Sequence, residues 1–183
     1  MQILRGLNRF SRTESSVHHR VDVNRLLSEQ VTLLRKTILA PAGIRDHLSL
    51  KQDLPGAAAD EDSLKQVFLN LIKNAAEAMP QGGNLHIRTD YIDETASGLP
   101  GGSQTGGRVE ITIKDDGPGI PENIRSRLFE PFISSKGADH RGLGLSIVHS
   151  IIKELNGTIT CEADSQIGTC FVISLPLSSI EKP

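Results

Sequence analysis

The chain contains 183 residues, of which 37% are hydrophobic and 23% charged, as is typical of one folded domain with a short appendage. The net charge is −2 and aromatic residues make up 3% of the chain, which argues against a basic or base-stacking nucleic-acid surface. No apolar run reaches the roughly 18 residues of a membrane span, and residues 1–10 lack an apolar stretch of signal-peptide length. We therefore expect no contact of this chain with nucleic acid or a membrane.

Charge is unevenly distributed along the chain. Residues 1–36 contain seven basic residues (Lys and Arg) and three acidic residues (Asp and Glu). Residues 37–183 contain 13 basic and 19 acidic residues. The basic residues are scattered, which favours a solvated basic helix over a nucleic-acid-binding arm. Cys161 and Cys170 lack the spacing of metal ligands and are interpreted as reduced core thiols, with a cross-strand contact between them as the alternative.

In chain order, the first predicted element is a short amphipathic helix over residues 2–13. It is too short to be stable alone, so we expect it to continue into, or pack against, a region outside this chain. A polar linker is predicted over residues 11–20 and a second amphipathic helix over residues 24–37. Pro41 and Gly43 interrupt that pattern, and partial alternation then predicts a strand over 44–50.

The clearest helical pattern follows an acidic start at residues 60–63. Its apolar face consists of Leu64, Val67, Phe68, Leu71, Ile72, Ala75 and Met79, and Pro80 ends it. Strands are predicted over residues 85–92 and 108–114, separated by a Gly-rich connection over 95–107. The remaining predictions are a short helix opened by Pro121, a polar loop over 133–141, a helix over 142–155 and strands over 158–163 and 169–175.

Four segments carry residues suited to chemistry, and the first lies on this clearest helix. Asn70 and Asn74 are four residues apart and therefore share a helix face. Their amide oxygens could coordinate Mg²⁺ together with phosphate oxygens and water. Two solvated asparagines on an exposed flank are the alternative, and this pattern alone favours that alternative.

The second segment is Asp115–Ile120, with the sequence DDGPGI, at the end of a predicted strand. Gly117 and Gly119 would let the backbone approach a ligand closely. An ionised carboxylate only accepts hydrogen bonds, for example from the exocyclic amino group of adenine. An ordinary acidic turn after a strand is the alternative.

The third and fourth segments flank the predicted polar loop. Phe129 and Phe132 precede it and are interpreted in part as an apolar anchor, while Lys136 within the loop could meet a terminal phosphate. Gly142 and Gly144 follow at the start of the last predicted helix, where free backbone N–H groups could bind an anion. The segment is neither a Walker A loop nor a dinucleotide fingerprint, and a Gly-rich helix cap is the alternative.

In this order the four segments resemble the N, G1, F and G2 boxes of the ATP-binding domain of sensor histidine kinases, in the superfamily that includes gyrase, the Hsp90 chaperones and MutL. The resemblance covers residues 21–177, including Leu64–Ala75 and the closing run from Gly168 to Pro176. Residues 3–12 resemble the end of the second helix of that family's dimerisation and phosphoacceptor domain. The implied fold is α+β: a two-layer sandwich, the Bergerat fold, with three helices on one face of a mixed, mostly antiparallel sheet.

The resemblance also implies roles for individual residues. Asn74 would be the Mg²⁺ ligand, with Asn70 near the metal or the phosphates, and Asp115 would accept a hydrogen bond from adenine. The base pocket would further comprise Gly117, Gly119, Ile120 and Thr169. The phosphate edge and its lid would comprise Lys136, Arg141, Gly142, Leu143, Gly144 and Leu145. The residues implied in catalysis are Asn70, Asn74 and Lys136.

Two features depart from the family pattern. His140 and Arg141 stand where the family often has Gly-Thr, so the lid hinge is less rich in glycine. Arg141 could contact phosphate, although we favour a solvated side chain. No phosphoacceptor motif is visible, because His18 is followed by His19 and not by an acidic residue. We therefore expect the phosphorylated His upstream of this chain, and treat the chain as part of a longer protein.

ATP hydrolysers of the superfamily carry a Glu at the position of Asn70, where it activates water. An Asn cannot act as a base at neutral pH, so the resemblance implies transfer of the γ-phosphoryl group of ATP to a His. We expect a histidine kinase catalytic domain over residues 21–180, with the end of the dimerisation helix and a linker over residues 1–20. A stand-alone ATPase or serine kinase, and a nucleotide-binding scaffold domain, are the alternatives.

The resemblance implies ATP and Mg²⁺ as ligands and a cytoplasmic location. The implied partners are a phosphoacceptor helical hairpin of the same protein, in a homodimer, and the receiver domain of a response regulator.

Overall fold

The computed structural model describes residues 19–93, 107–133, 142–164 and 168–178. The helix predicted over residues 2–13 lies outside these ranges. So do the Gly-rich connection, apart from Gly107, and the polar loop, apart from Ile133.

Five strands form the main sheet, in the order β2-β4-β5-β7-β6. In chain order they are β2 (Ile44–Ser49), β4 (Gly83–Ile92), β5 (Arg108–Asp115), β6 (Thr158–Asp164) and β7 (Gly168–Pro176). Strand β2 runs parallel to β4, and all other neighbours in this sheet are antiparallel. The expected mixed, mostly antiparallel sheet is confirmed.

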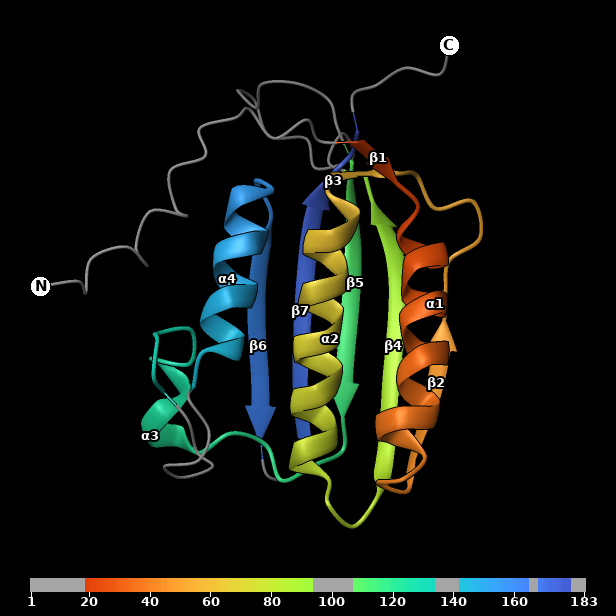
Figure 1. The fold of residues 1–183 in the computed structure, drawn as a ribbon. Helices are drawn as coiled ribbons and strands as arrows, with labels where there is room; N and C mark the ends of the chain where they lie inside the picture. The colour runs from red at the N-terminus through yellow and green to blue at the C-terminus, as the bar shows by residue number, and fades with distance from the viewer. Residues whose placement is uncertain (1–18, 94–106, 134–141, 165–167, 179–183) are drawn as a thin grey trace, which may run out of the picture.

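Three helices lie side by side on one face of this sheet (Figure 1). They are α1 (Val23–Leu34), α2 (Glu61–Ala78) and α4 (Gly144–Glu154). The central helix is α2, and α1 and α4 flank it. A short helix, α3 (Glu122–Arg125), starts after Pro121 as predicted. The two-layer α+β sandwich with three helices on one face is thereby confirmed. None of the helices in the described ranges has the length and apolar character needed to cross a bilayer.

Helix α2 forms because the sequence specifies both its start and its apolar face. The Asp60 carboxylate accepts a hydrogen bond from Ser63 N at 2.8 Å and so caps the first turn. Glu61 and Asp62 add negative charge at the positive end of the helix dipole. The predicted apolar face is buried, and Phe68 at its centre has no exposed surface.

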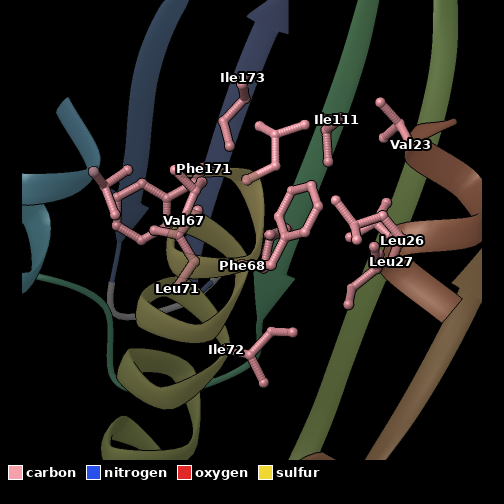
Figure 2. Close-up of a cluster of buried hydrophobic side chains, with 14 of the residues drawn as sticks. Val23, Leu26, Leu27, Val67, Phe68, Leu71, Ile72, Ile111, Phe171 and Ile173 are labelled. Atoms are coloured by element: carbon pink, nitrogen blue, oxygen red, sulfur yellow. The ribbon is translucent and has the colours of Figure 1, made fainter. Parts of the chain in front are cut away.

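Figure 2 shows how this face packs. Phe68 lies beside Leu26 and Leu27 of α1 and near Ile111 of β5. All four side chains are fully buried and belong to one core that joins the helical layer to the sheet. Burial of a side chain of this size contributes about 1.5–3 kcal/mol.

Three short elements differ from the sequence prediction. His19 and Arg20, predicted as linker, lie in β1 (His19–Val21), which pairs antiparallel with β3 (Ala57–Ala59). No strand is predicted at β3, because three alanines show no alternation of polar and apolar residues. After α1 the chain forms one π-helical turn, η1 (Arg35–Leu39), where the sequence predicts continued α-helix.

The two cysteines are free and are not cross-strand partners. Cys161 lies opposite Phe171, and Cys170 lies opposite Glu162. Adjacent strand positions point to opposite faces, so this register directs the two thiols to different sides of the sheet. Burial raises the pKa of Cys161 to about 12 and also raises that of Cys170. Cys161 packs against the core as predicted, whereas Cys170 lies on the other face of the sheet and is not part of the core.

The two ends of the sandwich gather different segments (Figure 1). The end of α2, the starts of β4 and β7 and the end of β5 meet at one end, which we call the Asp115 end. Strands β1 and β3 and the end of β7 meet at the opposite end, where Ser178 N donates to Gly56 O at 3.0 Å.

Candidate functional site

Asp115 is the last residue of β5, and only 4% of its surface is exposed. Its Oδ1 accepts hydrogen bonds from Gly117 N at 3.0 Å and Thr169 N at 3.2 Å. Thr169 is the register partner of Asp115 on β7 and is 5% exposed. The pairing of β5 with β7 thus brings together three residues that the sequence analysis selected. A carboxylate offers about four lone-pair positions, so Asp115 can accept a further hydrogen bond from a ligand.

The surroundings of Asp115 act on its ionisation in opposite directions. Burial, the largest effect, raises its pKa above the ordinary value of 3.8, and the charge of Asp116 adds to this. The hydrogen bonds from Gly117 and Thr169 lower the pKa by stabilising the carboxylate. The result is a partly desolvated acceptor held in place by the backbone.

The first residue of β7, Gly168, fits closely against the backbone of Asp115. Gly168 has a φ of +77°, and a Cβ at this position would lie 2.0 Å from Asp115 O. Any side chain here would push β7 away from β5 beside the Thr169 contact. Gly168 is therefore needed both for its backbone conformation and for this close approach.

One face of α2 forms the second part of the candidate site. Asn70, Asn74 and Ala78 follow one another at intervals of four residues and therefore share a face. A Cβ on Gly117 would lie 3.4 Å from Ala78 Cβ. A Cβ on Gly144 would lie 3.5 Å from Asn70 Oδ1 and 3.9 Å from Asn74 Oδ1. This face therefore adjoins the Asp115 loop at one end and the start of α4 at the other, about 12 Å along the helix axis.

The amide oxygens of this face are directed toward α4. Asn70 Nδ2 donates back to Gln66 O at 3.0 Å, which turns Asn70 Oδ1 toward Gly144. Two neighbouring amide oxygens suit a hard cation that keeps water and phosphate as its other ligands. The described residues contain no group of three or more His, Cys, Asp or Glu that could hold a metal ion.

The start of α4 lies beside these oxygens. Gly144 and Leu145 open the helix, and Leu143 caps it without a side-chain hydrogen bond. The first N–H groups of a helix have no partner within it and carry positive partial charge. Phe132 N donates to Gly142 O at 3.0 Å, which fixes the chain before α4 against the segment after α3.

The remaining predicted residues divide into two groups. Gly119 and Ile120 lie on the segment between Asp115 and α3, where Arg125 Nε donates to Ile120 O at 2.8 Å. Lys136 and Arg141 lie outside the described residues, so their implied roles stay predictions.

Asn84 is a contact residue of this region that the sequence analysis did not select. It lies at the start of β4, and it donates two hydrogen bonds to Asp116. The available signal in the sequence was the pair Gly82 and Gly83 just before it, where the backbone could approach a neighbouring group closely. The contact depends on the pairing of β4 with β5, which no local pattern in the sequence reveals.

The geometry combines two features in one site. A buried acceptor lies at one end, and amide oxygens beside a helix N-terminus lie at the other. Such a site suits an elongated ligand with a hydrogen-bond donor at one end and an anion, with its cation, at the other.

Comparison with known proteins agrees with this geometry. Residues 59–179 match the family model described as histidine kinase-, DNA gyrase B-, and HSP90-like ATPase. The chain is 40% identical over 146 residues to the sensory histidine kinase/phosphatase NtrB of Rhodobacter capsulatus, an alignment that covers 78% of this chain and 41% of that protein.

Two solved structures have the same fold. Full-length ShkA in complex with AMPPNP has a TM-score of 0.70 and 27% identity, covering 90% of this chain and 32% of that one. The histidine kinase ThkA in complex with the response regulator protein TrrA has a TM-score of 0.64 and 27% identity, covering 87% of this chain and 42% of that one. The chain therefore spans less than half the length of each of these three proteins.

Proposed function

Because this chain belongs to the family of histidine kinase-, DNA gyrase B-, and HSP90-like ATPases, we propose that it is the ATP-binding catalytic domain of a sensor histidine kinase. In this proposal it transfers the γ-phosphoryl group of ATP to a His on a helical hairpin of the same longer protein. The observation that carries the proposal is the single face of α2 that joins the buried Asp115 region to the start of α4.

The Asp115 end of that face is proposed to hold adenine. The Asp115 carboxylate, fixed by Gly117 N and Thr169 N, would accept a hydrogen bond from the exocyclic amino group. A base that presents a carbonyl oxygen at the same position would face an acceptor and would bind more weakly. Gly119 and Ile120 would complete the base pocket.

The other end is proposed to hold the phosphates. The free N–H groups at the start of α4, from Gly144 and Leu145, would bind phosphate oxygens, as the glycine-rich sequence predicts. Asn74 Oδ1, with Asn70 Oδ1 beside it, fits Mg²⁺, which would neutralise phosphate charge during transfer. Lys136 and Arg141 are proposed to contribute from the segment between Ile133 and Gly142.

Phosphoryl transfer is favoured over hydrolysis because of Asn70. Its amide cannot accept a proton from water at neutral pH, and its Nδ2 is occupied by Gln66 O. The protein would then act by positioning the nucleotide and stabilising its charge while an imidazole attacks the γ-phosphorus.

The proposed partners follow from the same family. A homodimer of the longer protein would present the phosphoacceptor hairpin. A response regulator receiver domain would receive the phosphoryl group, since the similar kinase ThkA forms a complex with a response regulator. Residues 1–18 are proposed to contain the end of the dimerisation helix and the linker to the catalytic domain, whose first strand begins at His19. The proposed use of ATP supports a cytoplasmic location.

The test is to incubate the purified chain with γ-labelled ATP and Mg²⁺ and to follow bound nucleotide, free phosphate and labelled protein together. We expect binding without phosphate release or self-labelling, and transfer once the phosphoacceptor hairpin is added. Steady phosphate release would contradict the kinase assignment and indicate a stand-alone ATPase.

Replacing Asn74 by Ala tests the proposed metal ligand. The variant should lose transfer to the hairpin while retaining the unfolding temperature of the parent protein. The matched control is Lys73→Ala, which removes the exposed neighbour that pairs with Glu77 on the same helix. Normal transfer by a folded Asn74→Ala protein would overturn the role given to Asn74.

A further inference from the structure

Asn84 and Asp116 are joined by two hydrogen bonds at the Asp115 end of the sheet. Asn84 N donates to Asp116 Oδ1 at 2.8 Å, and Asn84 Nδ2 donates to Asp116 Oδ2 at 2.7 Å. Both carboxylate oxygens are therefore engaged by one residue of the neighbouring strand. These contacts lower the pKa of Asp116, so it stays ionised and accepts both hydrogen bonds near neutral pH.

A third contact fixes the orientation of the Asn84 amide. Since an ionised carboxylate can only accept, Nδ2 faces Asp116 and Oδ1 faces the other way. Asn84 Oδ1 lies 3.2 Å from His47 Nε2, and the His47 ring stacks on His86. Asn84 is thus held from β2 as well as from β5.

Gly83 lies directly beside the Asp116 carboxylate, which is otherwise exposed. A Cβ on Gly83 would lie 2.5 Å from Asp116 Oδ1 and 2.5 Å from Met79 Sδ. The backbone at the start of β4 therefore lies between the Asp116 carboxylate and Met79 at the end of α2. An alanine at residue 83 would therefore require the Asp116 or the Met79 side chain to move.

We propose that Asn84 and Asp116 form a latch that positions the Asp115 carboxylate for the base of the nucleotide. The proposal rests on the proposed function, because it assigns a specificity role within the same site. Asp115 is gripped from the β7 side through Thr169 N. Asn84 of β4 holds the next residue, Asp116, by two hydrogen bonds. The loop that begins at Asp115 is therefore fixed by contacts with both β7 and β4. Both residues of the latch are positioning residues, since they act on the ligand only through Asp115.

The main test measures binding of ADP and of inosine 5′-diphosphate, each with Mg²⁺, by titration calorimetry. The two ligands share their phosphates and differ at the group that Asp115 would contact. Replacing Asp116 by Ala should weaken ADP binding about tenfold, and inosine diphosphate binding by less than about threefold. The base preference of the protein should therefore shrink. The conservative variant Asp116→Asn retains an oxygen for Asn84 N and should restore most of the preference.

The matched control is Asp90→Ala at the opposite end of β4. Asp90 is also a carboxylate held by several donors, from Arg88, Tyr91 N and Lys51, but it lies away from Asp115. This variant should leave both affinities unchanged. Gly83→Ala provides a second, independent disturbance of the latch and should reduce the base preference in the same direction.

A double-mutant cycle separates positioning from general loss of structure. If the latch acts through Asp115, Asp116→Ala should have little further effect on ADP binding in an Asp115→Asn background. Additive effects of the two substitutions on ADP binding would contradict the proposed role of the latch. So would an unchanged preference for ADP over inosine diphosphate in folded Asp116→Ala and Gly83→Ala proteins. Either result would leave the proposed function itself intact. Failure of the parent protein to bind ADP would overturn the proposed function instead.

Discussion

At the scale of single residues, the site depends on how the hydrogen-bonding capacity of Asp115 is divided. Two backbone N–H groups hold Oδ1, and the side chain is almost fully buried. A carboxylate in this setting cannot rotate freely to suit any ligand. It therefore selects ligands that bring a donor to its remaining lone pairs.

Replacing Asp115 by Asn should exchange an acceptor for a donor at the point of base contact. The Asn oxygen can still accept from Gly117 N and Thr169 N, which directs the new NH₂ group to the ligand. We expect ADP affinity to fall by about 10–100-fold, and the preference to shift toward inosine diphosphate, which presents a carbonyl oxygen there. Competitive displacement of a fluorescent ADP analogue measures both. An unchanged ratio of the two affinities would contradict the base contact.

The raised pKa of Asp115 predicts a dependence on pH. Because folding raises this pKa, ionisation of Asp115 disfavours the folded state at neutral pH, and that cost disappears as pH falls through the raised pKa. Protonation also removes the acceptor, so ADP affinity should decline at a pH above the ordinary carboxyl value of 3.8. Binding measured over a pH series should show this step in the parent protein. The step should be absent from Asp115→Asn, which has no titrating group there.

Some of these residues could be predicted from the sequence and others could not. Asp115, Gly117 and Thr169 lie in short motifs, and the structure brings these three together. The contact of Asn84 with Asp116 depends on which strand lies beside β5, and strand neighbours leave no local pattern. Motif spacing therefore identifies groups that are presented to a ligand more readily than groups that hold them in place.

At the scale of elements, α2 connects folding and function. Its buried face anchors the helix to the sheet, and the adjacent face presents Asn70 and Asn74 to the start of α4. The sequence predicts α2 well, because the N-cap, the spacing of the apolar residues and the terminating Pro80 all indicate the same helix. By contrast, β1 and β3 are three residues long and exist only through their mutual pairing, so local patterns do not predict them.

The cap of α2 gives a prediction about stability. Replacing Asp60 by Ala removes the acceptor of Ser63 N and should lower the free energy of unfolding by about 1 kcal/mol. Denaturant unfolding of the purified chain measures this loss. Asp62→Ala, in the same first turn, removes an exposed carboxylate that pairs with Lys65 and interacts with the helix dipole, and it should cost less, about 0.5 kcal/mol.

At the scale of the whole molecule, one core joins the sheet to all three long helices. Side chains from α1, α2, α4 and the central strands contribute to it. Local sequence patterns predict the strands of the main sheet and the helices that cover it, but they do not reveal the strand order or the parallel pairing of β2 with β4. The resemblance to a known family supplies the mixed sheet, and the register of that sheet then builds the Asp115 end.

The centre of this core should be sensitive to loss of volume. Phe68→Ala removes a fully buried ring beside α1 and near β5 and should destabilise the protein by about 3–5 kcal/mol. The neighbouring Leu69 is 40% exposed, so Leu69→Ala is the matched control and should cost about 1 kcal/mol or less. Equal losses in the unfolding free energy of the two variants would contradict the assigned centre of the core.

The described chain both enters and leaves the sandwich at the end opposite Asp115. Strand β1 begins there, and after β7 the contacts of Leu177 with Ala57 and of Ser178 with Gly56 close that end. The ten residues of β4 separate the two ends by about 33 Å. If the sandwich is held at the end opposite Asp115, turning it by about 20° there would carry the Asp115 end through about 11 Å. With the proposed phosphoacceptor hairpin joined at that end, a small rotation there would be enough to bring the bound nucleotide to the hairpin or to take it away.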